Sequence, residues 1–148
     1  MVKEYLDPRY VFFLEAATKE ETIAKIIDSL EPLFDNEGKE IFLKAVRERE
    51  ELVSTGLGMG VAVPHAKASI LSDFFIAIAV LKKGVDWGAL DGAAVRLVVM
   101  IGGPANRPGD YLQILSRLTL ALKAEERRKK ILQVTEAQEI VDLLAEGI

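Results

Sequence analysis

The chain has 148 residues, of which 50% are hydrophobic and 28% are charged, and its net charge is -4. These proportions are typical of one globular domain over residues 1–148, and the lack of a basic excess argues against a nucleic-acid-binding protein. The chain has no cysteine and one histidine, which excludes disulfides, thiolate catalysis and metal sites built from cysteines or several histidines.

The first third of the chain predicts a strand followed by two helices. The apolar run from Val11 to Leu14 predicts the strand. Thr18 and Glu21 have the spacing of a capping box, which indicates that a helix begins there. Asn36 is expected to cap a second helix that runs to about Leu52. The expected core contacts of this second helix are Ile41, Leu43, Val46 and Leu52.

The middle of the chain predicts strands that are covered on both faces. The glycine-rich segment VSTGLGMGVAVPHAK leads into a short strand at residues 61–63. Residues 74–81 and 95–101 are apolar at odd and even positions alike, which is typical of strands between two layers. Between these two runs, the Lys-Gly and Asp-Gly pairs of KKGVDWGALDG indicate turns.

Helical periodicity returns from about Asp110 and continues to near Ala145. A short segment within it ends at Ile131, and Thr135 with Gln138 forms a second capping box before the last helix. One apolar stripe consists of Leu112, Leu115, Leu118 and Leu122. Because predicted helices precede and follow the double-faced strands, we expect an α/β fold with a single sheet between helical layers.

The apolar runs also bear on the location of the protein. FFIAIAVL and LVVMI are far shorter than the ~20 residues that a membrane-spanning helix needs. The N-terminal sequence MVKEYLDPRY has no apolar stretch of the kind found in signal peptides. We therefore expect a cytoplasmic protein with no direct membrane insertion.

His65, the only histidine, lies in the most unusual local sequence of the chain. Three glycines precede it at alternate positions (Gly56, Gly58 and Gly60), and Pro64 stands directly before it. Because proline has no amide hydrogen, an interior strand is not expected to continue there, and His65 is expected at a strand end. The glycines allow a tight turn that brings backbone amides close to an anion. The spacing is not that of a dinucleotide-binding loop.

The segment REREELVSTGLGMGVAVPHAK resembles the phosphorylation-site signature of the fructose/mannitol-type (type 2) enzyme IIA domains of the bacterial sugar phosphotransferase system. In that family an arginine precedes the glycine loop, and an apolar-Ala-apolar-Pro-His motif carries the phosphorylated histidine. The matching positions here are Arg49 and His65. Two further blocks, GVDWGALDGAAVRLVVMIGGP and YLQILSRLTLAL, resemble later parts of the family in the same order.

The resemblance implies a three-layer α/β/α sandwich with a central mixed sheet. It also implies that His65 accepts a phosphoryl group from a histidine-containing phosphocarrier protein and passes it to an enzyme IIB component, with no cofactor and no metal. A neutral imidazole is nucleophilic near neutral pH, and the planar guanidinium of Arg49 suits phosphate oxygens. Many family members carry a second active-site histidine where this chain has Tyr111, whose hydroxyl can donate a hydrogen bond but cannot become a cation.

Several alternatives stay open at the level of sequence. The resemblance covers both sugar uptake and the nitrogen-regulatory branch of the family. A non-catalytic regulatory interaction module on the same fold is a different hypothesis, against which the presence of Arg49 and His65 counts. A hydrolase that uses His65 as a general base is a third, but the chain has no GxSxG sequence.

Three other residues near the glycine loop or in the following turn are expected to have structural roles. Ser54 and Thr55 are able to bind phosphate, but we expect them to cap a local turn. Trp87 is expected to pack within the domain rather than to stack on a ligand.

Overall fold

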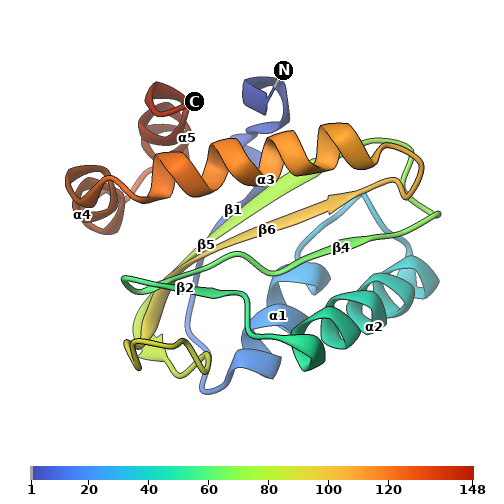
Figure 1. The fold of residues 1–148 in the computed structure, drawn as a ribbon, viewed down its shortest axis with the longest axis horizontal. Helices are drawn as coiled ribbons and strands as arrows, with labels where there is room; N and C mark the ends of the chain where they lie inside the picture. Colours follow the sequence, from blue (N-terminus) through green and yellow to red (C-terminus); the bar gives the residue numbers. More distant parts are fainter. Residues whose placement is uncertain (1) are drawn as a thin grey trace.

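The computed structural model describes residues 2–148, which form one sheet with helices on both faces (Figure 1). Two short 3-10 helices precede the first strand, at Val2–Tyr5 and Pro8–Tyr10. The strands are β1 (Val11–Leu14), β2 (Gly56–Gly58), β3 (Val61–Ala62), β4 (His65–Lys67), β5 (Phe75–Val85) and β6 (Val95–Gly103). The helices are α1 (Lys19–Asp28), α2 (Asn36–Leu52), α3 (Pro108–Leu122), α4 (Glu125–Gln133) and α5 (Ala137–Glu146).

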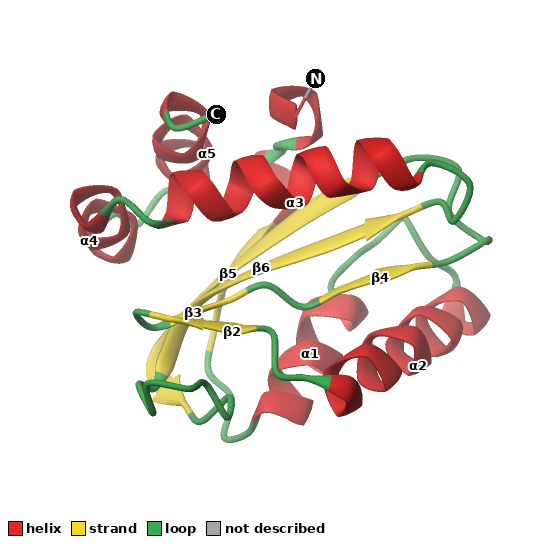
Figure 2. Ribbon diagram, in the orientation of Figure 1, coloured by secondary structure: helices red, strands yellow, loops and turns green. Residues whose placement is uncertain are grey.

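The sheet is mixed, with the strand order β1-β5-β6-β3-β2 and with β4 also paired to β6. β1 runs parallel to β5, β5 and β6 are antiparallel, and β3 and β4 both run parallel to β6. Figure 2 shows the yellow strands between two groups of red helices. The predicted three-layer α/β/α sandwich with a central mixed sheet is therefore confirmed.

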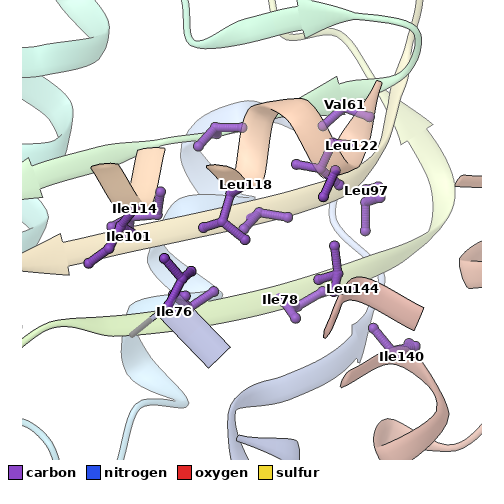
Figure 3. Packing of buried hydrophobic residues seen from close by; sticks show 14 of the residues in the cluster. Val61, Ile76, Ile78, Leu97, Ile101, Ile114, Leu118, Leu122, Ile140 and Leu144 are labelled. Atoms are coloured by element: carbon purple, nitrogen blue, oxygen red, sulfur yellow. The ribbon is translucent and has the colours of Figure 1, made fainter. Parts of the chain in front are cut away.

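Each face of the sheet has its own hydrophobic core because successive side chains of a strand point to opposite faces. On β5, Ile76 and Ile78 pack with α3 and α5, whereas Ala77 and Ala79 face α1 and α2. Figure 3 shows the first of these cores, where side chains from β5 and β6 meet those of α3 and α5. Odd and even positions of β5 and β6 are thus both apolar because each set packs into a different core.

The two N-terminal helices begin close to where the sequence predicts. Thr18 caps α1, and its hydroxyl oxygen accepts a hydrogen bond from the amide of Glu21 at 3.1 Å. The predicted helix start is confirmed. For α2, the capping residue is Asp35 and not Asn36, since the Asp35 carboxylate accepts from the amide of Gly38 at 2.7 Å.

The buried face of α2 differs from the predicted one. Val46 is buried as predicted and Leu43 is half-buried, but Ile41 is 42% exposed and Leu52 is 77% exposed. The residue that fills the core beside Val46 is Phe42, four positions earlier and therefore on the same helical face. Leu52 ends the helix at the rim of the pocket described below.

The stripe predicted on α3 is also partly wrong. Leu118 and Leu122 are buried, whereas Leu112 is 64% exposed. The first turns of α3 instead bury Tyr111 and Ile114 against the sheet. The exposed Leu112 lines the same pocket as Leu52.

Two local predictions in the loops are wrong. The Lys-Gly pair forms no turn, because Gly84 lies inside β5, where a Cβ atom would meet the Cβ of Ala94 at 2.7 Å. The absence of a side chain at Gly84 leaves room for the Cβ atom of Ala94. The capping box at the last helix is absent as well, since Glu136 occupies the N-cap and Gln138 donates a hydrogen bond to Asp142.

Candidate functional site

The site lies where the pairing along one edge of β6 is interrupted, between β3 and β4. Pairing with β6 stops after β3 and resumes at His65, which is opposite Ile101. Across the gap, the carbonyl oxygen of Pro64 accepts a hydrogen bond from the amide of Ile101 at 3.0 Å. His65 therefore lies at a strand end, as the sequence predicts, but it is the first residue of a further strand, β4, because Pro64 interrupts the ladder without ending it.

The imidazole of His65 is oriented by its own backbone. Its Nδ1 atom lies 2.7 Å from the carbonyl oxygen of Val63. A carbonyl oxygen can only accept, so Nδ1 carries a proton and donates it. Nε2 makes no hydrogen bond within residues 2–148. In the neutral ring, the lone pair on Nε2 is therefore available to an electrophile.

The surroundings of His65 favour this neutral ring. Burial lowers its pKa below the ordinary value, and the nearby cations Arg49 and Lys67 lower the pKa further. The hydrogen bond to the Val63 carbonyl and the charge of Glu50 act in the opposite direction without reversing the shift. At neutral pH the side chain is accordingly an uncharged nucleophile.

The lowered pKa of His65 can be measured by NMR without overlap, because the chain has one histidine and its imidazole resonances belong to His65. We expect NMR titration of the imidazole to give a midpoint below the ~6.5 of an unperturbed histidine. As the pH falls below that value, the unfolded chain takes up the proton first, so the free energy of unfolding should decrease. Denaturation of His65→Gln across the same pH range separates the contribution of His65 from that of the carboxylates. An NMR titration midpoint at or above the ordinary value would contradict the lowered pKa.

Arg49, His65 and Tyr111 line one surface pocket with a volume of about 550 Å³. The three residues come from α2, β4 and α3, so the fold brings together positions that are far apart in the sequence. The ring centroids of His65 and Tyr111 are 5.9 Å apart. The other lining residues are Ala45, Glu48, Leu52, Ala66, Lys67, Leu112 and Leu115.

Arg49 lies in the last turn of α2 and is half-buried. One terminal nitrogen of its guanidinium donates to the carbonyl oxygen of Val53 at 2.9 Å, which anchors the group at the helix end. Within residues 2–148 Arg49 forms no ion pair with a carboxylate. Its remaining donors are therefore available to an anion beside His65.

Tyr111 is buried on α3, and the described residues offer its hydroxyl no hydrogen-bond partner. Burial raises its pKa, which keeps the phenol uncharged at any physiological pH. Tyr111 thus presents a neutral ring and a free hydroxyl donor to the pocket.

Lys67 also belongs to this pocket, although the sequence analysis does not single it out. Its ammonium nitrogen lies 5.2 Å from the centroid of the Tyr111 ring, within the range of a cation–π contact. The signal that could have identified it is its position two residues after His65, since alternate residues of a strand share a face. That signal depends on knowing that β4 continues beyond Pro64.

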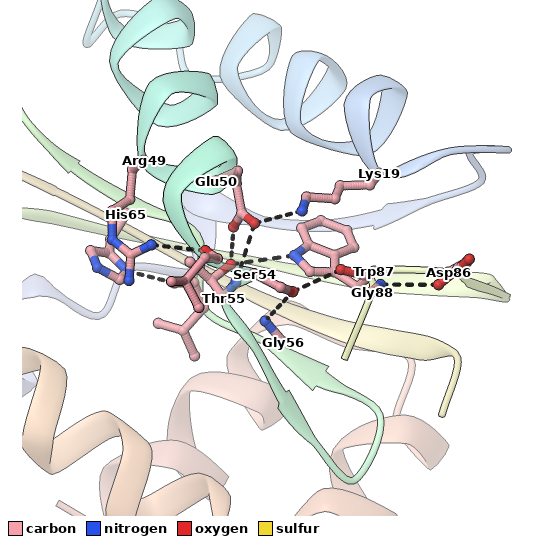
Figure 4. A network of polar contacts seen from close by, with 12 residues as sticks. Lys19, Arg49, Glu50, Ser54, Thr55, Gly56, His65, Asp86, Trp87 and Gly88 are labelled. Atoms are coloured by element: carbon pink, nitrogen blue, oxygen red, sulfur yellow. Dashed lines mark hydrogen bonds and ion pairs between the residues drawn. The ribbon is translucent and has the colours of Figure 1, made fainter. Parts of the chain in front are cut away.

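A buried carboxylate supports the other side of the site (Figure 4). Glu50 pairs with Lys19 at 2.7 Å and accepts hydrogen bonds from the amide and the hydroxyl of Thr55. The indole nitrogen of Trp87 donates to the same hydroxyl at 3.3 Å. These contacts hold the loop after α2 in place beside Arg49.

This network continues through the backbone to the imidazole. The carbonyl oxygen of Thr55 accepts from the amide of Val63 at 3.0 Å, and the Val63 carbonyl in turn accepts from His65.

The hydroxyl of Ser54 donates to the Trp87 carbonyl at 2.7 Å. The Ser54 hydroxyl also accepts from the amide of Gly56 at 3.1 Å and so caps a local turn, as the sequence predicts. The hydroxyl of Thr55 bonds to Glu50 and Trp87 instead of capping a turn. Trp87 is buried within the domain, as predicted.

Neutralising the buried carboxylate should weaken this support. In Glu50→Gln one carboxylate oxygen becomes an NH₂ group, so Lys19 loses its counter-charge. The carboxylate accepts from the Lys19 ammonium and from the amide and hydroxyl of Thr55, and one of these three donors loses its acceptor. We expect a loss of about 1–3 kcal/mol in the free energy of unfolding, the scale of a buried polar mismatch. Urea denaturation measures it, with Glu51→Gln on the exposed side of α2 as the matched control. Equal stability of the two variants would show that the Glu50 network is dispensable.

Two further observations concern metals and membranes. Residues 2–148 contain no cluster of three or more histidine, cysteine or acidic side chains arranged to hold a metal ion. Across the same residues, no helix combines the length and the apolar character needed to cross a bilayer.

Comparison with protein families gives a match to the model described as "Phosphoenolpyruvate-dependent sugar phosphotransferase system, EIIA 2" over residues 4–147. The chain is 37% identical over 132 residues to the PTS system fructose-specific EIIA component of Haloferax volcanii, an alignment that covers 89% of this chain and 86% of that protein.

Solved structures give the same picture. The nitrogen regulatory protein IIA-Ntr from Neisseria meningitidis superposes with a TM-score of 0.90 at 26% identity, covering 97% of this chain and 98% of that one. The enzyme IIAMtl in its complex with phosphorylated enzyme IIBMtl from Escherichia coli superposes with a TM-score of 0.77 at 27% identity, covering 95% and 97%.

Proposed function

The chain belongs to the EIIA 2 family of the phosphoenolpyruvate-dependent sugar phosphotransferase system, and from this premise we propose that His65 accepts a phosphoryl group and passes it to an enzyme IIB component. The family resemblance inferred from the sequence is confirmed. The observation that carries the proposal is the free Nε2 of a neutral His65 in an open pocket with Arg49.

In the proposed transfer the Nε2 lone pair attacks the phosphorus atom of a phosphohistidine on the donor. The new N–P bond forms at Nε2, and the donor imidazole takes the electron pair of the broken P–N bond. Positive charge then develops on the His65 ring, whose Nδ1–H already donates to the Val63 carbonyl at 2.7 Å. That hydrogen bond becomes stronger as the ring charges, because charge-assisted bonds are stronger than neutral ones.

The charge on the phosphoryl oxygens needs separate stabilisation, since phosphoryl transfer depends mainly on positioning and electrostatics. We assign this role to the free donors of Arg49, whose planar fork fits two phosphate oxygens. Tyr111 is the third member of the proposed site, and its ring lies beside the imidazole of His65, with the two ring centroids 5.9 Å apart. No cofactor and no metal takes part in the proposed steps.

We propose a histidine-containing phosphocarrier protein as the donor and an enzyme IIB component as the acceptor. Support for the acceptor comes from the Escherichia coli neighbour, which was solved in complex with a phosphorylated IIB. The rim of the pocket carries the exposed Leu52 and Leu112, which suit contact with a partner protein during the exchange.

The proposal includes residues 1–148 acting as one domain in the cytoplasm. The relatives include a fructose-specific component and a nitrogen regulatory protein, so acceptance by His65 is proposed for uptake and regulation alike. A non-catalytic module on this fold has no use for the free Nε2 of His65 and the unpaired donors of Arg49, which is why phosphoryl transfer is preferred.

The test is incubation of the chain with a phosphorylated histidine-containing phosphocarrier protein, followed by intact-mass measurement. We expect the mass of one phosphoryl group, retained in base and lost in acid as for an N–P bond. The Escherichia coli mannitol IIA domain with its own carrier is the positive control. A chain that gains no mass under conditions that label the control overturns the proposal and favours the non-catalytic module.

A further inference from the structure

The two sides of β4 face different layers of the fold. Ala66 of β4 and Ala68, which directly follows the strand, pack into the core on the α1–α2 side of the sheet, so His65 and Lys67 face the opposite side, toward α3. There the ring of Tyr111 contacts both, with its centroid 5.9 Å from the His65 ring and 5.2 Å from the Lys67 ammonium. The ring of Tyr111 thus lies beside both the imidazole of His65 and the ammonium group of Lys67.

Among the residues that the structure describes, the ammonium group of Lys67 has no carboxylate partner in this position. None of the ion pairs within residues 2–148 involves it. The one carboxylate that lines the pocket, Glu48, pairs with Lys44 at 4.0 Å instead. A cation–π contact holds an ammonium group without neutralising it, whereas a carboxylate would cancel its charge. The pocket therefore contains a second positive charge besides that of Arg49.

We propose that Lys67, held against the ring of Tyr111, is a phosphoryl-binding cation of this site. The role rests on the proposed phosphorylation of His65. Arg49 reaches the pocket from α2 and Lys67 from β4 beside α3, so an anion on Nε2 has a cation on each side. The ammonium group has three donors on a flexible stem and suits an oxygen that moves during transfer. Tyr111 then acts as a positioning residue through its ring, and its hydroxyl is secondary.

The first experiment measures the equilibrium of phosphoryl exchange between the phosphorylated carrier and the chain. We expect Lys67→Gln to shift this equilibrium toward the carrier by about three- to tenfold, the scale of an exposed charge-assisted contact. Lys67→Arg should restore it, because the charge returns. Lys82 is another exposed lysine, on β5 and outside the pocket; Lys82→Gln changes the net charge identically and should have no effect. High salt should reduce the difference between wild type and Lys67→Gln.

The second experiment separates the ring of Tyr111 from its hydroxyl. Tyr111→Phe retains the aromatic face and should lose clearly less than Tyr111→Leu, which should behave like Lys67→Gln. The double variant with Lys67→Gln and Tyr111→Leu should lose no more than the single variants, since both changes remove one interaction. A full loss in Tyr111→Phe would assign the effect to the hydroxyl and overturn the positioning role.

A third measurement needs no partner protein. Because Lys67 lowers the pKa of His65, Lys67→Gln should raise the NMR titration midpoint of the imidazole, and Lys82→Gln should not. The inference is overturned if wild type accepts the phosphoryl group while Lys67→Gln matches it in both exchange equilibrium and His65 midpoint. A wild-type chain that accepts no phosphoryl group overturns the proposed function and this role together.

Discussion

Replacement of His65 by glutamine is expected to abolish acceptance of the phosphoryl group. A carboxamide has a similar length and can donate to the Val63 carbonyl, but its nitrogen has no nucleophilic lone pair. No other imidazole can substitute, because His65 is the only histidine of the chain. The fold should persist, since the change removes at most one hydrogen bond, worth about 0.5–1.5 kcal/mol.

Intact-mass measurement after incubation with the phosphorylated carrier gives the result directly, and thermal denaturation of the unlabelled protein checks the fold. The expected outcome is one phosphoryl group on wild type and none on a folded His65→Gln. Equal labelling of the two would move the acceptor to another residue. In that case a carboxylate is the first candidate, and the label would be lost in base as well as in acid.

The sequence predicts the layers of the fold because burial leaves a periodic pattern. The double-faced apolar runs correspond to β5 and β6, and helical spacing locates α1 and α2. The same pattern does not show which of two adjacent apolar residues faces the sheet. Ile41 and Phe42 are both hydrophobic neighbours on α2, and only the packing against β5 decides that Phe42 is buried.

The residues of the candidate site likewise divide into those that the sequence indicates and those that it does not. The family resemblance indicates Arg49, His65 and Tyr111, and the structure places all three in one pocket. Glu50 was missed because, in the run REREE, an acid that faces solvent and one that faces the core look alike. Its burial depends on Lys19, a partner distant in the sequence. Such long-range pairs leave no local signal.

Lys67 was missed for a different reason, which lies in the backbone. The sequence predicts a strand over residues 61–63 and none after Pro64, and a residue outside a strand has no defined face. Once β4 resumes at His65 in register with Ile101, alternation assigns Lys67 to the same side as the imidazole. The sequence pattern does not show that a further strand, β4, begins at His65, and for this reason it gives no indication of Lys67.

Substitution of Arg49 by lysine is expected to slow phosphoryl transfer by about 10- to 100-fold, the rate equivalent of one lost charge-assisted hydrogen bond. The guanidinium binds the Val53 carbonyl with one nitrogen and keeps further donors for the anion beside His65. A lysine has a single nitrogen at the end of its chain. It cannot occupy the helix-end carbonyl and present a bidentate fork at the same time.

Rapid-quench measurement of transfer from the carrier tests this, with Arg47→Lys on the exposed part of α2 as the matched control. The pKa of His65 shows whether a variant has lost the positive charge at position 49 or only the geometry of the guanidinium, since the charge of Arg49 contributes to the lowering of this pKa. Arg49→Lys should leave the imidazole midpoint nearly unchanged while transfer slows, whereas Arg49→Gln should raise the midpoint and slow transfer further. If Arg49→Lys transfers as fast as wild type, a point charge is sufficient at this position, and the planar fork of Arg49 has no part in the reaction.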